Sequence, residues 1–144
     1  MTQTEHLKSA AKDLFKIYCS QPYRFPDLMP HDIQSIELLK GEWDQKDSER
    51  LWTFVDDGCG TWKDKVGNIH NNGMSITWIL LEGKEPQKLY SSLKVVHQFS
   101  VSGNGCDAKV TLHYTKKDAN NPDPEEYMNF LTKMLKAADK GATA

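Results

Sequence analysis

The residue best placed to do chemistry is His97, because the pattern of the chain puts this titratable side chain on an apolar strand face. Apolar and polar residues alternate here, and His97 falls in the series formed by Leu93, Val95, Phe99 and Val101. A histidine that points into a cavity can bind a polar ligand group or act as a general acid or base. A hydrogen-bonded histidine in a mixed core is the more common case, and we weigh that structural interpretation above the chemical one.

Two tyrosines are the next candidates. Tyr114 falls in the apolar series of the following strand, and Tyr127 begins the apolar stripe of the last helix. A phenol on a cavity wall can donate to a ligand carbonyl, although aromatic bulk in a core explains both residues equally well. If the protein is an enzyme, we expect His97 with Tyr114, or with Tyr127, to move the proton.

Other chemical signals are weak. Asp56 and Asp57 are adjacent acids in a glycine-containing turn, where neighbouring side chains point apart and are usually solvated. His70 precedes an Asn-Asn-Gly turn and reads as a solvated turn residue. The motifs of phosphate-binding loops, dinucleotide-binding folds, zinc peptidases and serine hydrolases are absent from the sequence. We therefore predict no cofactor and no metal, which leaves non-covalent binding or a reaction that needs only a shaped cavity and one acid or base.

Composition narrows the class of protein. The chain has 144 residues, 38% of them hydrophobic, which suits a single domain over residues 1–144 with its own core. The net charge is −2 and the lysines are scattered among acids, so we expect no nucleic-acid partner. We expect no membrane span, no signal peptide and hence a cytoplasmic protein. The chain has an odd number of cysteines, and they lie far apart in the sequence, at Cys19, Cys59 and Cys106. This pattern favours three reduced thiols.

The elements that must position these residues are mostly strands. Short runs with β character are separated by turn residues, and Asn71-Asn72-Gly73 is a strong hairpin signal. A short first strand at 5–10 and a helix at 11–18 precede them, with a second short helix at 27–29 among prolines. The pattern predicts an antiparallel meander. Its six strands are expected at 33–39, 49–55, 61–70, 75–81, 90–101 and 108–115.

One amphipathic helix closes the chain. Asp123 is placed to cap it, Pro124 suits the first helical position, and Glu126 completes a capping box. An apolar stripe follows at spacings of three and four, and Gly141 is expected to end the helix. The stripe consists of Tyr127, Phe130, Leu131, Met134, Leu135 and Ala138. A sheet covered by one such helix must either be filled with side chains or enclose a cavity.

Four segments, in order along nearly the whole chain, resemble the plant major latex protein-like branch of the Bet v 1 superfamily. They are PHDIQSIELLKGEWDQKDSERLW (30–52), ILLEG (79–83), LYSSLKV (89–95) and NPDPEEYMNFL (121–131). The resemblance implies an α+β helix-grip, START-like fold. In that fold a curved seven-stranded antiparallel sheet and two short helices are gripped by a long C-terminal helix across a hydrophobic cavity.

The chain also departs from that family. In the loop at 41–48, Asp44 and Asp47 stand where relatives usually carry glycine, which predicts a stiffer and more acidic loop. The segment before Pro30 is shortened, and a residue is added between Gly83 and Tyr90. Both changes flank the cavity entrances implied by the fold, so the identity of the ligand cannot be transferred from relatives.

Three functions remain open. We favour binding of a small hydrophobic plant metabolite, such as a steroid, lipid, terpenoid, flavonoid or alkaloid, in defence or specialised metabolism. A cofactor-independent cyclase or isomerase that uses the same cavity is the alternative, and a protein-interaction role comes third. We expect a monomer or a weak dimer. The predicted cavity wall comprises Phe54, Val95, His97, Phe99, Leu112, Tyr114, Tyr127, Phe130, Leu131 and Met134.

Overall fold

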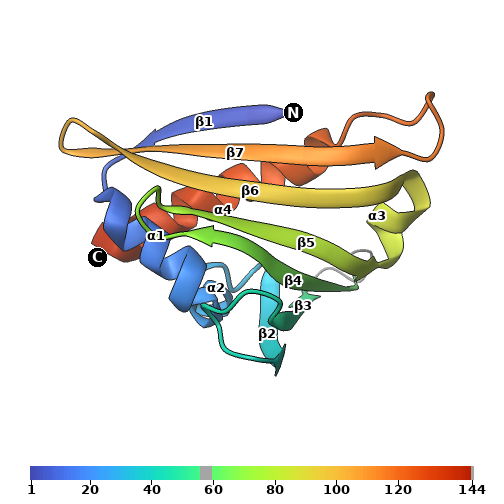
Figure 1. Ribbon diagram of the computed structural model, residues 1–144, viewed down its shortest axis with the longest axis horizontal. Helices are drawn as coiled ribbons and strands as arrows, with labels where there is room; N and C mark the ends of the chain where they lie inside the picture. Colours follow the sequence, from blue (N-terminus) through green and yellow to red (C-terminus); the bar gives the residue numbers. More distant parts are fainter. Residues whose placement is uncertain (56–59, 144) are drawn as a thin grey trace.

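The computed structural model describes residues 1–55 and 60–143, and its strands form one antiparallel sheet (Figure 1). The seven strands lie in the order β1-β7-β6-β5-β4-β3-β2, so the first strand pairs with the last. The bounds are β1 Thr2–Leu7, β2 Ile33–Lys40, β3 Glu49–Phe54, β4 Thr61–His70, β5 Ser75–Gly83, β6 Tyr90–Ser102 and β7 Gly105–Lys116. The predicted meander and the helix-grip fold are confirmed. The first strand begins and ends about three residues earlier than predicted.

Among the described residues, four α-helices and one 3-10 turn accompany the sheet. Their bounds are α1 Ala11–Ser20, the 3-10 turn Pro22–Arg24, α2 Phe25–Leu28, α3 Lys84–Leu89 and α4 Glu125–Thr143. Helix α3 was not predicted, because Gly83 and Pro86 read as breakers, whereas Gly83 in fact precedes the helix and Pro86 lies inside it. Figure 1 shows α1 and α3 at opposite ends of the sheet, with α4 running between those ends.

The long helix differs from expectation at both ends. It begins at Glu125, and Asp123 does not cap it, because the Asp123 carboxylate accepts from Tyr114 and Lys116 instead. The helix continues past Gly141 to residue 143. Gly141 has a packing role: a β-carbon added there would collide with Leu28 of α2. This close approach of two helices, and not a helix stop, accounts for the glycine.

The acidic loop before β3 keeps a backbone conformation that glycine favours. Gly41 has φ +76° and Asp47 has φ +69°, in the left-handed region that aspartate tolerates better than most residues. The Asp47 amide donates to the carbonyl oxygen of Val66 at 2.8 Å, which ties the loop to β4. Asp47 therefore keeps a left-handed backbone conformation without being a glycine.

The inward face of the sheet follows the predicted alternation with one exception. Along β6, Leu93, His97 and Phe99 are buried, but Val101 is 74% exposed because the strand there runs out into the β6–β7 hairpin. On β3 the inward face is the aromatic one, and Trp52 is 4% exposed.

Candidate functional site

A cavity of about 540 Å³ lies between α4 and the sheet. Its size falls within the roughly 300–1,000 Å³ of small-molecule sites, and most of its wall is apolar or aromatic. The wall is formed by Trp52, Phe54, Trp62, Asp64, Trp78, Leu80, Lys88, Leu89, Leu93, Val95, Leu112, Glu126, Tyr127, Phe130, Leu131 and Met134.

Most of the residues predicted from the sequence face this cavity. The structure brings together seven of them, from strands β3, β6 and β7 and the long helix. They are Phe54, Val95, Leu112, Tyr127, Phe130, Leu131 and Met134. The alternation along the strands and the three-four spacing of α4 determine that these seven side chains point to the same side.

His97 is not part of the cavity wall, which corrects the sequence-based placement. It is 1% exposed and packs between aromatic rings, with its centroid 4.7 Å from that of Tyr18 and 4.2 Å from that of Trp78. Burial, with a smaller contribution from the positive charge of Arg50, lowers the pKa of His97 from 6.5 to about 3. The imidazole is therefore neutral at physiological pH. Neither ring nitrogen has a hydrogen-bond partner among the described residues.

Phe99 and Tyr114 also lie away from the cavity. Phe99 is 1% exposed and contacts Phe15 and Tyr18 of α1, with centroid distances of 6.5 and 5.1 Å. The Tyr114 hydroxyl donates to the Asp123 carboxylate at 2.9 Å, outside the wall. This hydrogen bond, followed by desolvation, raises the pKa of Tyr114.

The polar group that sequence reasoning missed is a buried ion pair between neighbouring strands. Arg50 of β3 and Asp64 of β4 are directly opposite in the register. The guanidinium donates to both carboxylate oxygens, from Nε at 2.7 Å and from Nη2 at 2.8 Å. Trp52 adds a third donor through its indole Nε1 at 3.2 Å. The signal was present in the phase of β3, because Arg50 lies two residues before Trp52 and shares its face.

Tryptophan rings hold this ion pair in place. The Arg50 side chain is fully buried, and its guanidinium carbon lies 4.9 Å from the ring centroid of Trp78 and 5.8 Å from that of Trp52. These are cation–π distances. Of the pair, only Asp64 reaches the cavity wall. The cavity therefore has one carboxylate in an otherwise aromatic part of its wall.

A second polar region lies where the cavity meets α3 and the first turn of α4. Lys88 and Glu126 contribute one charge of each sign, beside the apolar Leu89 and the phenol of Tyr127. Tyr127 packs edge-on against Trp62, with their centroids 5.2 Å apart. Helix α3, through Lys88 and Leu89, thus forms part of the wall.

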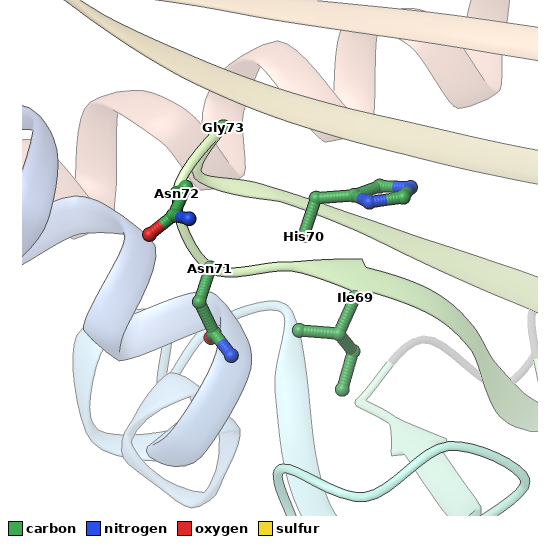
Figure 2. Close-up of a pocket in the computed structure, with 5 residues that line it drawn as sticks. All are labelled: Ile69, His70, Asn71, Asn72 and Gly73. Carbon is green, nitrogen blue, oxygen red and sulfur yellow. The ribbon is translucent and has the colours of Figure 1, made fainter.

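The β4–β5 hairpin is a poor candidate for a ligand site, although an open hollow of about 660 Å³ lies on its surface. Five consecutive residues, 69–73, line that hollow, and Figure 2 shows the His70 side chain pointing away from the side to which Ile69 and Asn71 point. Such side chains cannot converge on one ligand. His70 is exposed, as a turn residue should be. Asp56 and Asp57 lie outside the described residues.

Within residues 1–55 and 60–143, no cluster of three His, Cys, Asp or Glu side chains could hold a metal ion. No helix in that part of the chain is long and apolar enough to cross a membrane.

Known proteins match both the sequence and the fold. The chain is 30% identical over 137 residues to MLP-like protein 329 of Arabidopsis thaliana, with 93% of this chain and 89% of the relative covered. Ginseng major latex-like protein 151 from Panax ginseng superposes with a TM-score of 0.92 at 20% identity, covering 100% of this chain and 97% of the other. Norcoclaurine synthase from Thalictrum flavum, in complex with dopamine and hydroxybenzaldehyde, gives a TM-score of 0.79 at 19% identity, covering 97% and 83%.

The match to the family itself is nearly complete in length. Residues 2–142 match the Pathogenesis-related protein Bet v 1 family, and the relatives of similar sequence are plant major latex-like proteins. The sheet, the gripping helix and the enclosed cavity are the architecture that this resemblance implied. The chain therefore belongs to the Bet v 1 family, in its major latex protein-like branch.

Proposed function

We propose that the protein binds a small hydrophobic molecule in the cavity between α4 and the sheet. The observation that carries this proposal is the cavity itself, about 540 Å³ with a wall in which apolar and aromatic side chains outnumber polar ones. Burial of ligand surface against that wall supplies the affinity at roughly 25 cal/mol per Å² before the costs of association.

The proposed ligand is a plant metabolite, because the relatives of similar sequence are plant proteins. A steroid, lipid, terpenoid, flavonoid or alkaloid is small enough to occupy such a volume in whole or in part. We place this binding in the cytoplasm, in defence or specialised metabolism, with a monomer or weak dimer as the working unit.

Catalysis has weaker support than binding. A cyclase or isomerase needs an acid or base in contact with the substrate. Of the candidates from the sequence, His97 and Tyr114 do not line the cavity and Tyr127 does, so the expected pair of His97 with a tyrosine is not assembled there. Asp64 is on the wall, but it already accepts two hydrogen bonds from Arg50. The likeness to norcoclaurine synthase, at 19% identity, shows a shared fold alone.

A retention experiment tests the proposal. The purified protein is incubated with a plant metabolite extract and re-isolated, and mass spectrometry identifies what is retained and what is converted. We expect retained apolar compounds and no new products. New products that depend on the protein would instead support the enzyme.

Two variants on the same strand provide a matched control. Val95→Trp places an indole in the cavity. Val101→Trp replaces a side chain that is 74% exposed and so places the indole at the surface. Retention should be lost in Val95→Trp and kept in Val101→Trp. Equal retention by both folded variants would place the binding site elsewhere and overturn the proposal.

A further inference from the structure

The cavity wall presents one hydrogen-bond acceptor of fixed position, the carboxylate of Asp64. Its side chain is 9% exposed and borders the cavity from β4. The carboxylate cannot rotate freely, because the Arg50 guanidinium holds both of its oxygens from the adjacent strand. A ligand therefore meets an acceptor that is already oriented, which lowers the entropic cost of binding to it.

This acceptor has room for one more donor. A carboxylate offers about four lone-pair sites. Three are occupied, by Nε and Nη2 of Arg50 and by Nε1 of Trp52. Among the described residues no further donor reaches Asp64, so one acceptor site remains for a group in the cavity.

The neighbouring donors cannot serve a ligand in the same way. Arg50 Nη1 and the Trp78 indole nitrogen lack partners among the described residues, but both atoms are sealed within the packed layer behind the wall. A ligand carbonyl could reach them only if aromatic side chains moved. At this point on its wall, the cavity accepts hydrogen bonds and does not donate them.

Charge excludes two other kinds of ligand group. Arg50 lies behind Asp64 and balances its charge, so a ligand ammonium placed there would lose its water without meeting a net negative site. A ligand carboxylate would face the Asp64 carboxylate directly, and like charges repel. A neutral hydroxyl both donates to Asp64 and avoids these penalties.

The surrounding wall selects the rest of the molecule. Trp52, Trp62 and Trp78 line the cavity around Asp64, and the rings of Trp52 and Trp78 lie 5.4 Å apart. Aromatic side chains pack well against flat ring systems, through stacked or edge-on contacts.

From these observations we propose that the cavity binds a neutral, flat ring system through a hydroxyl group that donates to Asp64, with Arg50 as the residue that positions the carboxylate. The proposal rests on the proposed binding function and narrows it to hydroxylated ring compounds whose hydroxyl lies at Asp64.

Two probes that differ by one donor test the proposal on the unmodified protein. 2-Naphthol and 2-methoxynaphthalene share the ring and the oxygen, but only the naphthol can donate. Isothermal titration calorimetry at pH 7 should show about tenfold tighter binding of 2-naphthol, the contribution of one hydrogen bond to a charged group. Equal affinities would overturn the Asp64 assignment and leave the cavity as a binding site. If neither probe binds, the further proposal fails, and the retention experiment with the metabolite extract decides the proposed function separately.

A double variant locates the preference. Asp64→Leu alone would leave Arg50 charged and unpaired in the interior, so the pair is replaced together as Arg50→Met with Asp64→Leu. This variant should lose the tenfold preference for 2-naphthol over 2-methoxynaphthalene. A preference that survives in the folded double variant would assign it to another group and refute the proposal.

A charged probe and a spectroscopic signal complete the test without relying on the variant. Protonated 2-naphthylmethylamine should bind more weakly than 2-naphthol, and tighter binding would contradict the charge argument. In ¹⁵N NMR, the Arg50 Nε signal should shift more with 2-naphthol than with 2-methoxynaphthalene at equal saturation. Identical shifts would show that the hydroxyl does not reach the ion pair.

Discussion

Strands β6 and β7 cross two regions of the interior that differ in packing, although their sequences alternate in the same way throughout. At one end, Leu93, Val95 and Leu112 face the cavity. At the other end, His97 and Phe99 are covered by a second layer of side chains. The strand pattern alone does not distinguish the hollow half from the solid half.

Helix α1 makes the difference. It contacts the sheet at the solid end, where its Tyr18 is 0% exposed and lies within 5.5 Å, centroid to centroid, of the rings of His97, Phe99 and Trp78. The hollow end has no comparable filling helix among the described residues, and α4 spans it from the far side. Whether an inward side chain meets a ligand or a protein neighbour is thus decided by the layer above the strand.

The largest expected effect is the difference in stability loss between the same substitution made in the solid half and in the hollow half. Phe99→Ala removes a ring that is fully surrounded, and we expect it to lower the free energy of unfolding by about 3–5 kcal/mol. Phe130→Ala only enlarges an existing cavity and should cost about 1–2 kcal/mol. Urea denaturation measures both. Equal losses would mean that Phe130 is packed as tightly as Phe99 and that the hollow half is not hollow.

A smaller effect concerns acid stability of the solid half. Burial holds the pKa of His97 at about 3, below the 6.5 of an unfolded chain. Between these values the unfolded state binds more protons, so stability is fully present above pH 6.5 and falls as the pH drops toward 3. From pH 7 to pH 5 this group alone should remove about 2 kcal/mol.

Two histidine variants isolate that contribution. His97→Phe should flatten the stability profile between pH 7 and pH 5, because no proton can then bind at this position in the unfolded state. His113→Gln changes an exposed histidine on β7 and serves as the control for the loss of an imidazole. An unchanged slope in His97→Phe would show that His97 is accessible to protons in the folded state.

The smallest effect is expected at Tyr114, which lies outside both regions. Tyr114→Phe removes the solvent-exposed hydrogen bond to Asp123, so urea denaturation should show almost no loss of stability. Binding of 2-methoxynaphthalene should also be unaffected. A clear loss of affinity would restore Tyr114 to the cavity wall, where the sequence had placed it.

Local alternation identified the strands, and the resemblance to known plant proteins supplied the fold and the cavity. Val95, Leu112 and Phe130 were placed correctly because alternation and helical spacing determine which way a side chain points. His97 was misplaced, because its contacts with Tyr18 and Trp78 are made by residues distant in sequence.

The ion pair was missed for a different reason. Charged residues are expected outside, so Arg50 and Asp64 were not considered although they share the inward phase of Trp52. Their burial requires both partners, and the pairing depends on the register between β3 and β4. Continuing the inward phase two residues back from Trp52 would have pointed to Arg50.

The most direct test of the account is a ¹⁵N NMR titration of the four tryptophan indoles with 2-naphthol. Trp52, Trp62 and Trp78 line the cavity, whereas Trp43 packs against Tyr23 outside it, with the two ring centroids 5.7 Å apart. The account predicts saturable shifts of the three cavity indoles and none for Trp43. Shifts of Trp43 alone, or no shift of any indole at saturating probe, would contradict the claim that the hollow half of the sheet is the binding site.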